Sequence, residues 1–443
     1  MRGFLAPSIG VTCAAALALP LTPPATAATA GPTQAAVAAA LPGAASPGAA
    51  LPAAGLPGGT ESLPLTPLTR DRAAAGAVQG LPRRDVRPFS LLGVVWDDPE
   101  AALDGTVQVR TRAVGSGAWS AWQDVETHNA DHGADPGTAE RASGRVRGAT
   151  APLWVGASDG VEIRVSPATA ARTEDTARGA RTVSAPVALP AGLRLELVDP
   201  GAPDPASARG LPAASAGRPA APAPVAPAPA APAAPGAPEV KPYIGPRPAI
   251  VTRKGWGADE KLREKKFVYT KKVKAAFVHH SATGNSYTCA QAPSVIRGIY
   301  RYHVKSMGWR DLGYNFVVDK CGKIYEGRAG GVAKPVLGAH TLGFNTDSMG
   351  IAVLGTFTSK KPSAAAVTAI AKLTAWKLGL SGANPKGKTY LKSGGGNLYR
   401  KGKNVRLDVI SGHRDGFATE CPGKQLYGKL GTARSTAARY QGR

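Results

Sequence analysis

Near the C-terminal end of the chain, the stretch SGHRDGFATECPGKQL holds His413, Thr419 and Cys421 within nine residues of glycine-rich sequence. Imidazole and thiolate are two of the ligand types that zinc prefers, so this loop could supply two ligands of a zinc site, with a third from elsewhere in the chain. A cysteine that is followed at once by Pro422 cannot continue a helix. The alternative interpretation is a loop cysteine that pairs in a disulfide.

The cysteine count depends on whether the chain is exported. The N-terminal stretch MRGFLAPSIGVTCAAALALPLTPPATAATA starts with a basic residue, continues as an apolar run and ends in small residues that suit a signal-peptide cleavage site, so we expect a secreted, extracellular protein. Lipidation at Cys13 is an alternative reading of this segment. Removal of residues 1–28 takes Cys13 away and leaves an odd number of cysteines in an oxidising compartment.

Three cysteines remain after that removal: Cys289, Cys321 and Cys421. A zinc thiolate at Cys421 would explain one unpaired cysteine in a secreted protein, and a free reactive thiol is the alternative. Cys289 and Cys321 would then form a disulfide.

The net charge of +24 is distributed unevenly. Residues 1–240 contain 18 Arg, no Lys and 20 acidic residues, a balance of −2, whereas residues 241–443 contain 23 Lys and 13 Arg against 10 acidic residues, a balance of +26. A field of this sign favours an anionic polymer as partner, and for an exported protein a teichoic acid or acidic glycan of the cell wall fits better than nucleic acid. A contribution to solubility alone is the alternative.

Composition divides the chain into five segments. Residues 1–28 are the predicted signal peptide, 29–80 a disordered Ala/Pro-rich arm, 81–200 an all-β domain, 201–244 a Pro/Ala-rich linker between two independently folding units, and 245–443 a mixed α/β domain. No second apolar run is long enough to span a membrane, so we expect no membrane span after signal cleavage, and a monomer.

Alternating apolar and polar residues with turn signals predict a β-sandwich-like fold for the all-β domain, with strands at 89–96, 106–114, 119–125, 152–157, 161–166 and 193–199. No cluster of titratable residues in this domain predicts an active site. Its tryptophans are either a sugar-stacking platform or core residues: Trp96, Trp119, Trp122 and Trp154.

The basic C-terminal domain has the pattern of a mixed central sheet flanked by helices. Strands are predicted at 275–282, 313–319, 323–327, 349–357 and 405–411, and helices at 289–307 and 363–380, the second with Ser363 as its N-cap. His279 or His280 ends the first strand and His413 follows the last. Neighbours on a strand point to opposite faces, so only one residue of the His pair can face a shared site, and spacing does not choose between them.

Five motifs in the same order resemble the peptidoglycan recognition protein and zinc amidase type 2 superfamily: FVHHSAT, GWRDLGYNFVV, IYEGRAGG, GAHTLGFNTDSMGIAVLG and GHRDGFATECPG, over roughly 250–430. The region before Pro200 is similar to the N-terminal β region of secreted actinobacterial amidases of this kind, whose role the resemblance does not settle. Members of the family that cleave are N-acetylmuramoyl-L-alanine amidases, which hydrolyse the amide between the lactyl group of muramic acid and the first L-alanine of the stem peptide.

The resemblance assigns roles to individual positions. It implies Zn²⁺ as cofactor and peptidoglycan as substrate, with His279, His413 and Cys421 as metal ligands. Tyr314 matches the catalytic tyrosine and Thr419 a position near the metal. The positions that match the muropeptide groove are His340 and Asn345, together with Arg328 and Trp309.

Three protein ligands would leave the fourth zinc position open for a water molecule, as in catalytic sites. Tyr314 and Thr419 could then hydrogen-bond the developing oxyanion or relay a proton to the leaving amine.

Three other functions compete with hydrolysis. A non-catalytic peptidoglycan-recognition protein would have the groove without the reaction. A structural zinc site would show a fourth strong ligand, such as His280, that closes the coordination sphere. Nucleic-acid binding lacks a recognition motif and conflicts with export.

Overall fold

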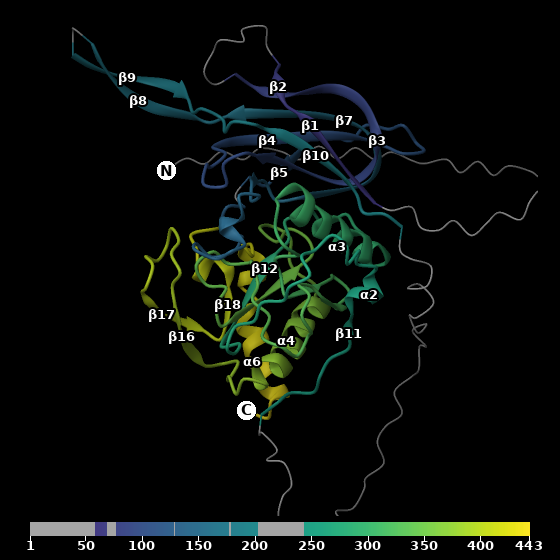
Figure 1. The fold of residues 1–443 in the computed structure, drawn as a ribbon, viewed down its shortest axis with the longest axis vertical. Helices are drawn as coiled ribbons and strands as arrows, with labels where there is room; N and C mark the ends of the chain where they lie inside the picture. The colour runs from purple at the N-terminus through teal and green to yellow at the C-terminus, as the bar shows by residue number, and fades with distance from the viewer. Residues whose placement is uncertain (1–57, 69–76, 128, 177–178, 203–242) are drawn as a thin grey trace, which may run out of the picture. The chain divides into compact units, whose positions relative to one another are not determined.

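The computed structural model describes residues 58–68, 77–127, 129–176, 179–202 and 243–443 (Figure 1). The predicted signal peptide and most of the predicted linker lie outside the described residues. No helix in the described ranges is both long enough and apolar enough to cross a bilayer.

The N-terminal domain is built from strands, as predicted. They are β1 (Gly59–Pro64), β2 (Thr66–Pro67), β3 (Gln79–Trp96), β4 (Gly105–Ala113), β5 (Gln123–Val125), β6 (Gly148–Ala149), β7 (Leu153–Pro167), β8 (Thr169–Thr176), β9 (Gly179–Pro186) and β10 (Arg194–Asp199), with a 3₁₀ turn at Arg141–Ser143. Eight of them form one hydrogen-bonded sheet with the path β1-β10-β3-β7-β4-β5, to which β2 and β6 add on β3, and β8 pairs with β9 separately.

Two expectations for this domain were wrong in detail. The arm does not extend to residue 80, because β1 pairs along its length with the distant β10 and Leu63 and Leu65 are buried in the domain core. The two strands expected at 152–157 and 161–166 are one long strand, β7, which continues through Asp159 and Gly160. The pairing of β7 with β4 shifts register at this point, between Arg112 and Ala113, as at a β-bulge.

The four tryptophans of the N-terminal domain divide into two pairs. Trp96 and Trp154 are buried core residues. Trp119 and Trp122 are half-buried, and arginine side chains from β3, β4 and β7 lie over their rings: Arg83, Arg110 and Arg164. The free platform of four aromatic rings is therefore not present.

The C-terminal domain has a mixed six-stranded sheet. Its strands are β11 (Ile250–Val251), β12 (Ala275–His280), β13 (Phe316–Val318), β14 (Ile324–Glu326), β15 (Ser348–Val353) and β18 (Ile410–Gly412), in the order β11-β14-β13-β15-β12-β18, and β16 (Lys388–Lys392) pairs with β17 (Asn404–Asp408) outside it. The helices are α2 (Arg253–Trp256), α3 (Ala292–Arg301), α4 (Ala364–Gly379), α5 (Lys424–Tyr427) and α6 (Leu430–Tyr440), with 3₁₀ turns at Cys289–Gln291 and His413–Asp415 and a π-helical turn at Tyr302–Ser306.

The long helix α4 forms where its sequence predicts it. The Ser363 side chain accepts a hydrogen bond from the Ala366 amide, which satisfies one of the unpaired donors at the helix start. Its apolar residues, together with those of α6, bury one face of the sheet, including Val278 on β12 and Ile351 on β15. That face is thereby closed, and polar chemistry is left to the opposite face and to the strand ends.

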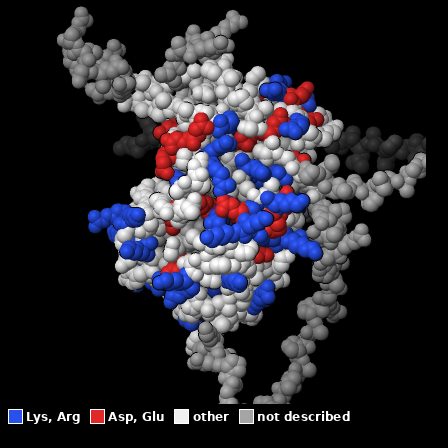
Figure 2. All heavy atoms as spheres, viewed as in Figure 1, with Lys and Arg blue, Asp and Glu red and all other residues white. Residues whose placement is uncertain are grey.

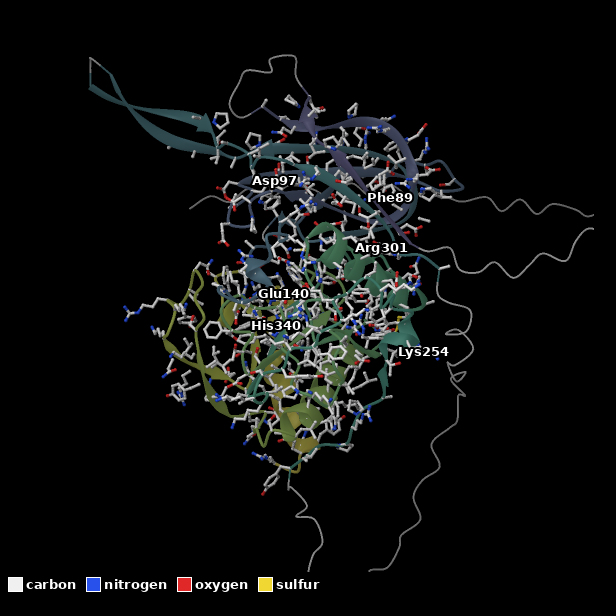
Figure 3. All side chains as sticks on the ribbon, viewed as in Figure 1. Phe89, Asp97, Glu140, Lys254, Arg301 and His340 are labelled. Atoms are coloured by element: carbon white, nitrogen blue, oxygen red, sulfur yellow. A yellow bond between two sulfur atoms is a disulfide. The ribbon has the colours of Figure 1, made fainter. Side chains whose placement is uncertain are left out.

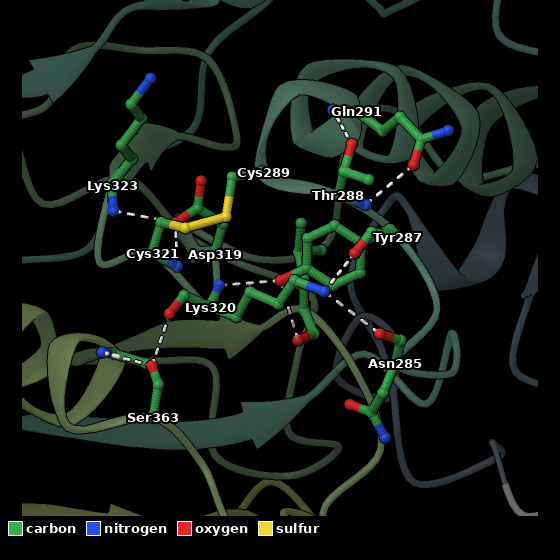
Figure 4. Close-up of a disulfide and its surroundings, with 12 residues drawn as sticks. Asn285, Tyr287, Thr288, Cys289, Gln291, Asp319, Lys320, Cys321, Lys323 and Ser363 are labelled. Carbon is green, nitrogen blue, oxygen red and sulfur yellow. Dashed lines mark hydrogen bonds between the residues drawn. A yellow bond between two sulfur atoms is a disulfide. The ribbon is translucent and has the colours of Figure 1, made fainter. Parts of the chain in front are cut away.

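The predicted disulfide between Cys289 and Cys321 is present and joins the start of α3 to the β13–β14 turn (Figure 4). The turn is held by Asp319, whose side chain accepts hydrogen bonds from the amides of Cys321 and Lys323. The bridge closes a loop of 32 residues, for which chain entropy predicts a stabilisation of about 3–4 kcal/mol.

The two domains share a hydrophobic cluster, so they are not the independent units that the linker predicted. Side chains alternate along β3, so Leu92 and Val94 enter the core of the N-terminal domain while Leu91 and Val95 pack on α3 of the C-terminal domain. The backbones approach closely: a Cβ at Gly93 would lie 2.3 Å from the Tyr302 hydroxyl. That hydroxyl contacts the backbone carbonyl of Val94 at 3.3 Å.

We expect Leu91→Ala to destabilise the full chain, because Leu91 is fully buried between β3 and α3. Loss of a buried leucine side chain costs about 2–5 kcal/mol. The midpoint of urea unfolding should fall in Leu91→Ala and stay unchanged in the matched control Leu398→Ala, whose leucine is 42% exposed. Equal midpoints for the two variants would contradict the shared core.

Candidate metal centre

Three parallel strands bring the first ligand candidates together. β12 lies between β15 and β18 and runs parallel to both, so the carboxyl ends of the three strands share one edge of the sheet. Val278 on β12 pairs with Gly412 on β18. The next residue along the chain is a histidine in both cases, His279 within β12 and His413 directly after β18, and their ring centroids are 4.4 Å apart.

The structure resolves the choice between the two adjacent histidines. Ala276 and Val278 point into the core beneath α4, so strand alternation turns His280 to that face and His279 to the other, on the same side as Phe277. Nδ1 of His280 accepts a hydrogen bond from the Phe357 amide at 3.4 Å. Of the pair, His279 therefore belongs to the group of ligand candidates, while His280 lines the adjoining cavity.

The loop after β18 adds Cys421. Asp415 stabilises the turn that carries His413, because its carboxylate accepts hydrogen bonds from the Gly412 amide at 2.8 Å and the Tyr427 hydroxyl at 2.7 Å. The chain then returns so that Sγ of Cys421 lies 3.8 Å from Nδ1 of His279. Cys421 is buried and is the unpaired cysteine of the described residues.

A fourth side chain, His132 of the N-terminal domain, completes the group. One ligand atom from each of His132, His279, His413 and Cys421 lies within 4.8 Å of the others. The sequence predicted an open fourth position and named His280 as the residue that would close a structural site. The structure instead places His132 there, from a domain for which no titratable cluster was predicted.

Hydrogen bonds orient the imidazole rings. Nε2 of His279 lies 3.4 Å from the Thr341 hydroxyl, which leaves Nδ1 directed at Cys421. Nε2 of His413 lies 3.1 Å from the backbone carbonyl of Asp131 and can donate to it. Nδ1 of His132 lies 2.8 Å from the Asp131 carboxylate. Such partners fix the tautomer of a metal-binding histidine and the orientation of its ring.

The residues present fit a divalent metal ion. Nδ1 of His413 and Nε2 of His132 are buried and have no hydrogen-bond partner among the described residues, although buried polar atoms are normally paired. Both atoms belong to residues of the cluster of four, and Nδ1 of His413 lies 3.6 Å from the Asp131 carboxylate. Two or three imidazole nitrogens and one sulfur are the donor set that tetrahedral zinc prefers.

The protonation states of His279 and His413 also favour metal binding. Burial and the neighbouring His413 hold the pKa of His279 well below its usual value, and burial lowers the pKa of His413 to about 3 although Asp131 opposes the shift. Both rings are therefore neutral at pH 7 and can act as ligands. Burial and the charge of Asp131 raise the pKa of the Cys421 thiol well above its ordinary value.

Tyr314 and Thr419 lie at the cluster. The Tyr314 ring is 5.4 Å from the His279 ring and 5.7 Å from the His132 ring, and burial raises its pKa well above 10. The Thr419 hydroxyl accepts a hydrogen bond from the Cys421 amide. Both residues line a small cavity beside the ligand set. Its other lining residues include Asn129, His132 and Cys421.

The four residues expected to line a muropeptide groove are buried. His340 packs 5.3 Å from His279, ring to ring, and Trp309 stacks on His303. Arg328 and Asn345 are bonded to the N-terminal domain: Arg328 to Glu140, and Asn345 to the Gly133 carbonyl and the Asp135 carboxylate. The four residues thus lie in one region, but Arg328 and Asn345 are already bonded to side chains or backbone of the N-terminal domain.

Residues 129–147, here called the 129–147 segment, were not predicted from the sequence to contact the site. They belong to the connection between β5 and β6, and contacts across more than a hundred residues leave no local periodicity to detect. One signal was available: the connection from Glu126 to Arg147 is longer than compact domains normally tolerate without regular structure. Long connections of this kind are commonly functional.

Two family models match separate regions of the chain. A family model described as N-acetylmuramoyl-L-alanine amidase matches residues 269–424, and one described as Rv3811 N-terminal galactose-binding domain-like matches residues 47–186. Peptidoglycan-recognition protein SC2 of Drosophila simulans is 31% identical over 183 residues, which cover 41% of this chain and 85% of that protein. Peptidoglycan-recognition protein 1 of Holotrichia diomphalia is 32% identical over 184 residues, covering 41% and 79%.

Among solved structures, peptidoglycan recognition protein LE in complex with tracheal cytotoxin is 31% identical, with a TM-score of 0.32 over 42% of this chain and 93% of that one. The assignment rests on the sequence matches. The chain belongs to the peptidoglycan recognition protein and amidase type 2 family. Its function is accordingly related to peptidoglycan, as an amidase or as a recognition protein.

We expect the affinity of the full chain for Zn²⁺ to rise with pH. The pKa of Cys421 is raised while the pKa values of His279 and His413 are lowered, so binding must displace about one proton, from the thiol. The association constant should rise about tenfold per unit from about pH 7 to about pH 8.5, measured by chelator competition. Cys421→Ala should bind weakly and lose this slope. A flat profile for the unaltered chain would contradict thiolate ligation.

Proposed function

We propose that this chain is a secreted, zinc-dependent N-acetylmuramoyl-L-alanine amidase that hydrolyses the bond between the lactyl group of muramic acid and L-alanine in peptidoglycan. The observation that supports it most is the buried set of His279, His413 and Cys421 beside Tyr314, within the region that matches the amidase family. A recognition protein needs no unpaired buried thiol next to two neutral imidazoles.

His279, His413 and Cys421 would hold the zinc ion. A bound zinc ion supplies Lewis acidity: it polarises a carbonyl and lowers the pKa of water toward about 7. The Tyr314 phenol is protonated at neutral pH, as any tyrosine is, and burial raises its pKa further, so it can donate a hydrogen bond to the oxygen on which negative charge develops. The Thr419 hydroxyl accepts from the Cys421 amide and donates to the Asp131 carboxylate, whose pKa this hydrogen bond helps to lower. Its proton could be donated to the same oxygen or to the leaving amine in place of Asp131.

The strongest competing function is a structural zinc site, because His132 supplies the fourth ligand that such a site requires. Two observations favour catalysis over it. His132 reaches the cluster from another domain, whereas the other three groups belong to the amidase-like region. Tyr314 and Thr419 line the adjoining cavity, where a purely structural site has no use for two hydroxyl donors.

The surface charge fits a wall-bound substrate. Lys and Arg side chains are spread over the exposed face of the C-terminal domain (Figure 2), and the sequence places all 23 lysines after residue 240. We propose export to the cell wall, where this charge would favour anionic wall polymers around the peptidoglycan. The all-β domain, similar to a galactose-binding domain, would contribute a second contact with the wall.

We expect purified peptidoglycan to release stem peptides when incubated with the zinc-loaded chain, with release followed by mass spectrometry. A chelator should abolish release and added Zn²⁺ should restore it. Because His132 lies against the ligand set, the assay should be run on the intact chain and on His132→Ala. Absence of release from both would contradict the proposed activity.

Tyr314→Phe should lower the rate of release about 10²- to 10³-fold, the usual effect of losing one oxyanion donor, while zinc binding stays intact. Tyr390→Phe is the matched control, since Tyr390 on β16 is 60% exposed and should keep the parental rate. Parental turnover by Tyr314→Phe would show that the phenol has no part in the reaction.

A further inference from the structure

The 129–147 segment presents buried polar groups to the centre from outside the amidase-like region. Its residues Asp131, His132, Asp135 and Glu140 are all at least nine-tenths buried. Ala134 and Val146 anchor it in the cluster shared with Met307 and Trp309. The Arg147 amide donates to the Met307 carbonyl. A loop that only connects two strands would leave such side chains in water.

The first part of the segment contacts the ligand set. Nδ1 of His132 is bonded to its own neighbour, Asp131, so Nε2 is the free nitrogen, and this buried atom has no partner among the described residues. The Asp131 carbonyl accepts from Nε2 of His413 and also from the Leu342 amide. The segment therefore both offers a fourth ligand and orients an existing one.

The middle of the segment supplies hydrogen-bond acceptors for the Asn345 side chain. The Asn345 side-chain amide donates to the Gly133 carbonyl at 2.9 Å and to the Asp135 carboxylate at 2.6 Å. The same carboxylate accepts from the Gly343 amide at 2.8 Å. These groups are a peptide carbonyl and a carboxylate, which are also the groups that a peptidoglycan stem peptide carries.

The end of the segment supplies a carboxylate partner for the Arg328 guanidinium. Glu140, labelled in Figure 3, forms a two-point pair with the guanidinium at 2.8 and 2.9 Å, and the two side chains are only 6% and 5% exposed. Glu140 also accepts from the Arg310 amide at 3.2 Å. A paired arrangement of this kind is geometrically specific, and it leaves Arg328 no free donor face toward a second carboxylate.

The free space at the ligand set itself is too small for substrate. A larger cavity of about 360 Å³ shares Glu126 and Ala282 with it, but none of the four ligand candidates lines that cavity. The cavity beside the ligand set has a volume of about 20 Å³, room for about one water molecule. Pockets that hold a ligand of even drug size have about 300–1,000 Å³. A muropeptide could reach the ligand set only after the segment had moved.

We infer that the 129–147 segment is an autoinhibitory element that holds the enzyme in a closed state. His132 binds the metal as its fourth ligand, and Asp135 and Glu140 take the place of substrate carboxyl groups on Asn345 and Arg328. The inference rests on the proposed function, because the metal and the muropeptide are those of the amidase. Displacement of the segment exposes the metal and the groove together.

The metal half of the inference is tested by X-ray absorption at the zinc edge on the full chain. We expect three imidazoles and one sulfur in the intact chain, and two imidazoles, one sulfur and one oxygen ligand in His132→Ala. Zinc affinity, measured by chelator competition, should fall at least about tenfold in His132→Ala. Two imidazoles and an oxygen ligand already in the intact chain would overturn the assignment of His132.

The groove half is tested by binding of a soluble muropeptide, in a Tyr314→Phe background to suppress turnover. Glu140→Gln weakens the hold on Arg328 and leaves the ligand set complete, so it keeps the test informative even if His132→Ala does not fold. We expect it to bind the muropeptide at least about tenfold more tightly than its parent, since apparent affinity scales with the open fraction. Glu162→Gln, which loses an acid–arginine pair on β4 and β7, is the matched control and should equal the parent.

Equal affinities for Glu140→Gln and Glu162→Gln would overturn autoinhibition. This result is separate from the fate of the proposed activity. Zinc coordination and muropeptide binding are measured without hydrolysis, so they report on the segment even if no variant releases stem peptides. Conversely, hydrolysis by an intact chain with an open fourth position would confirm the amidase and refute the closed state.

Discussion

The centre depends on the parallel pairing of β12 with β18. That register sets Val278 opposite Gly412, so His279 on β12 and His413, the first residue after β18, lie at the same level and their rings meet. A shift of one residue would turn His279 into the core beneath α4 and bring His280 to the site in its place. The packing of α4 and α6 on one face of the sheet fixes the register, because it requires Ala276 and Val278 to point inward.

Burial orders the ligand side chains, but it also removes their polar atoms from water. Imidazole nitrogens and a thiol removed from water need partners, and each ring obtains one through Thr341 or Asp131. The ring nitrogens without a partner among the described residues belong to His132 and His413, and each of these residues has a ligand atom at the point where the four candidates come within 4.8 Å of one another. A cation at that point would satisfy them and would also reverse the effect of burial on the Cys421 thiol, whose pKa is raised in its surroundings.

The contact between the domains follows from the alternation of side chains along β3. One set of side chains builds the core of the N-terminal domain and the other set covers α3. A sheet with two apolar faces must bury both. That contact brings β6, and with it the 129–147 segment, next to the amidase-like region. The acids of the segment then meet Arg328 and Asn345, which would otherwise face an open groove.

Sequence by itself determined the elements with strong local signals. It located α4 and its cap, most of the strands, the disulfide pair and the residue types of the centre, since periodicity, capping and motif spacing are properties of short stretches. It also limited the choice at the end of β12 to two histidines. Only the tertiary structure decided that His279 faces the site, that β1 belongs to the sheet, that β7 is one strand, and that His132 and Glu140 reach the centre. These outcomes rest on strand pairing and domain contact between residues far apart in the chain, and local sequence does not encode which distant partner will satisfy a buried group.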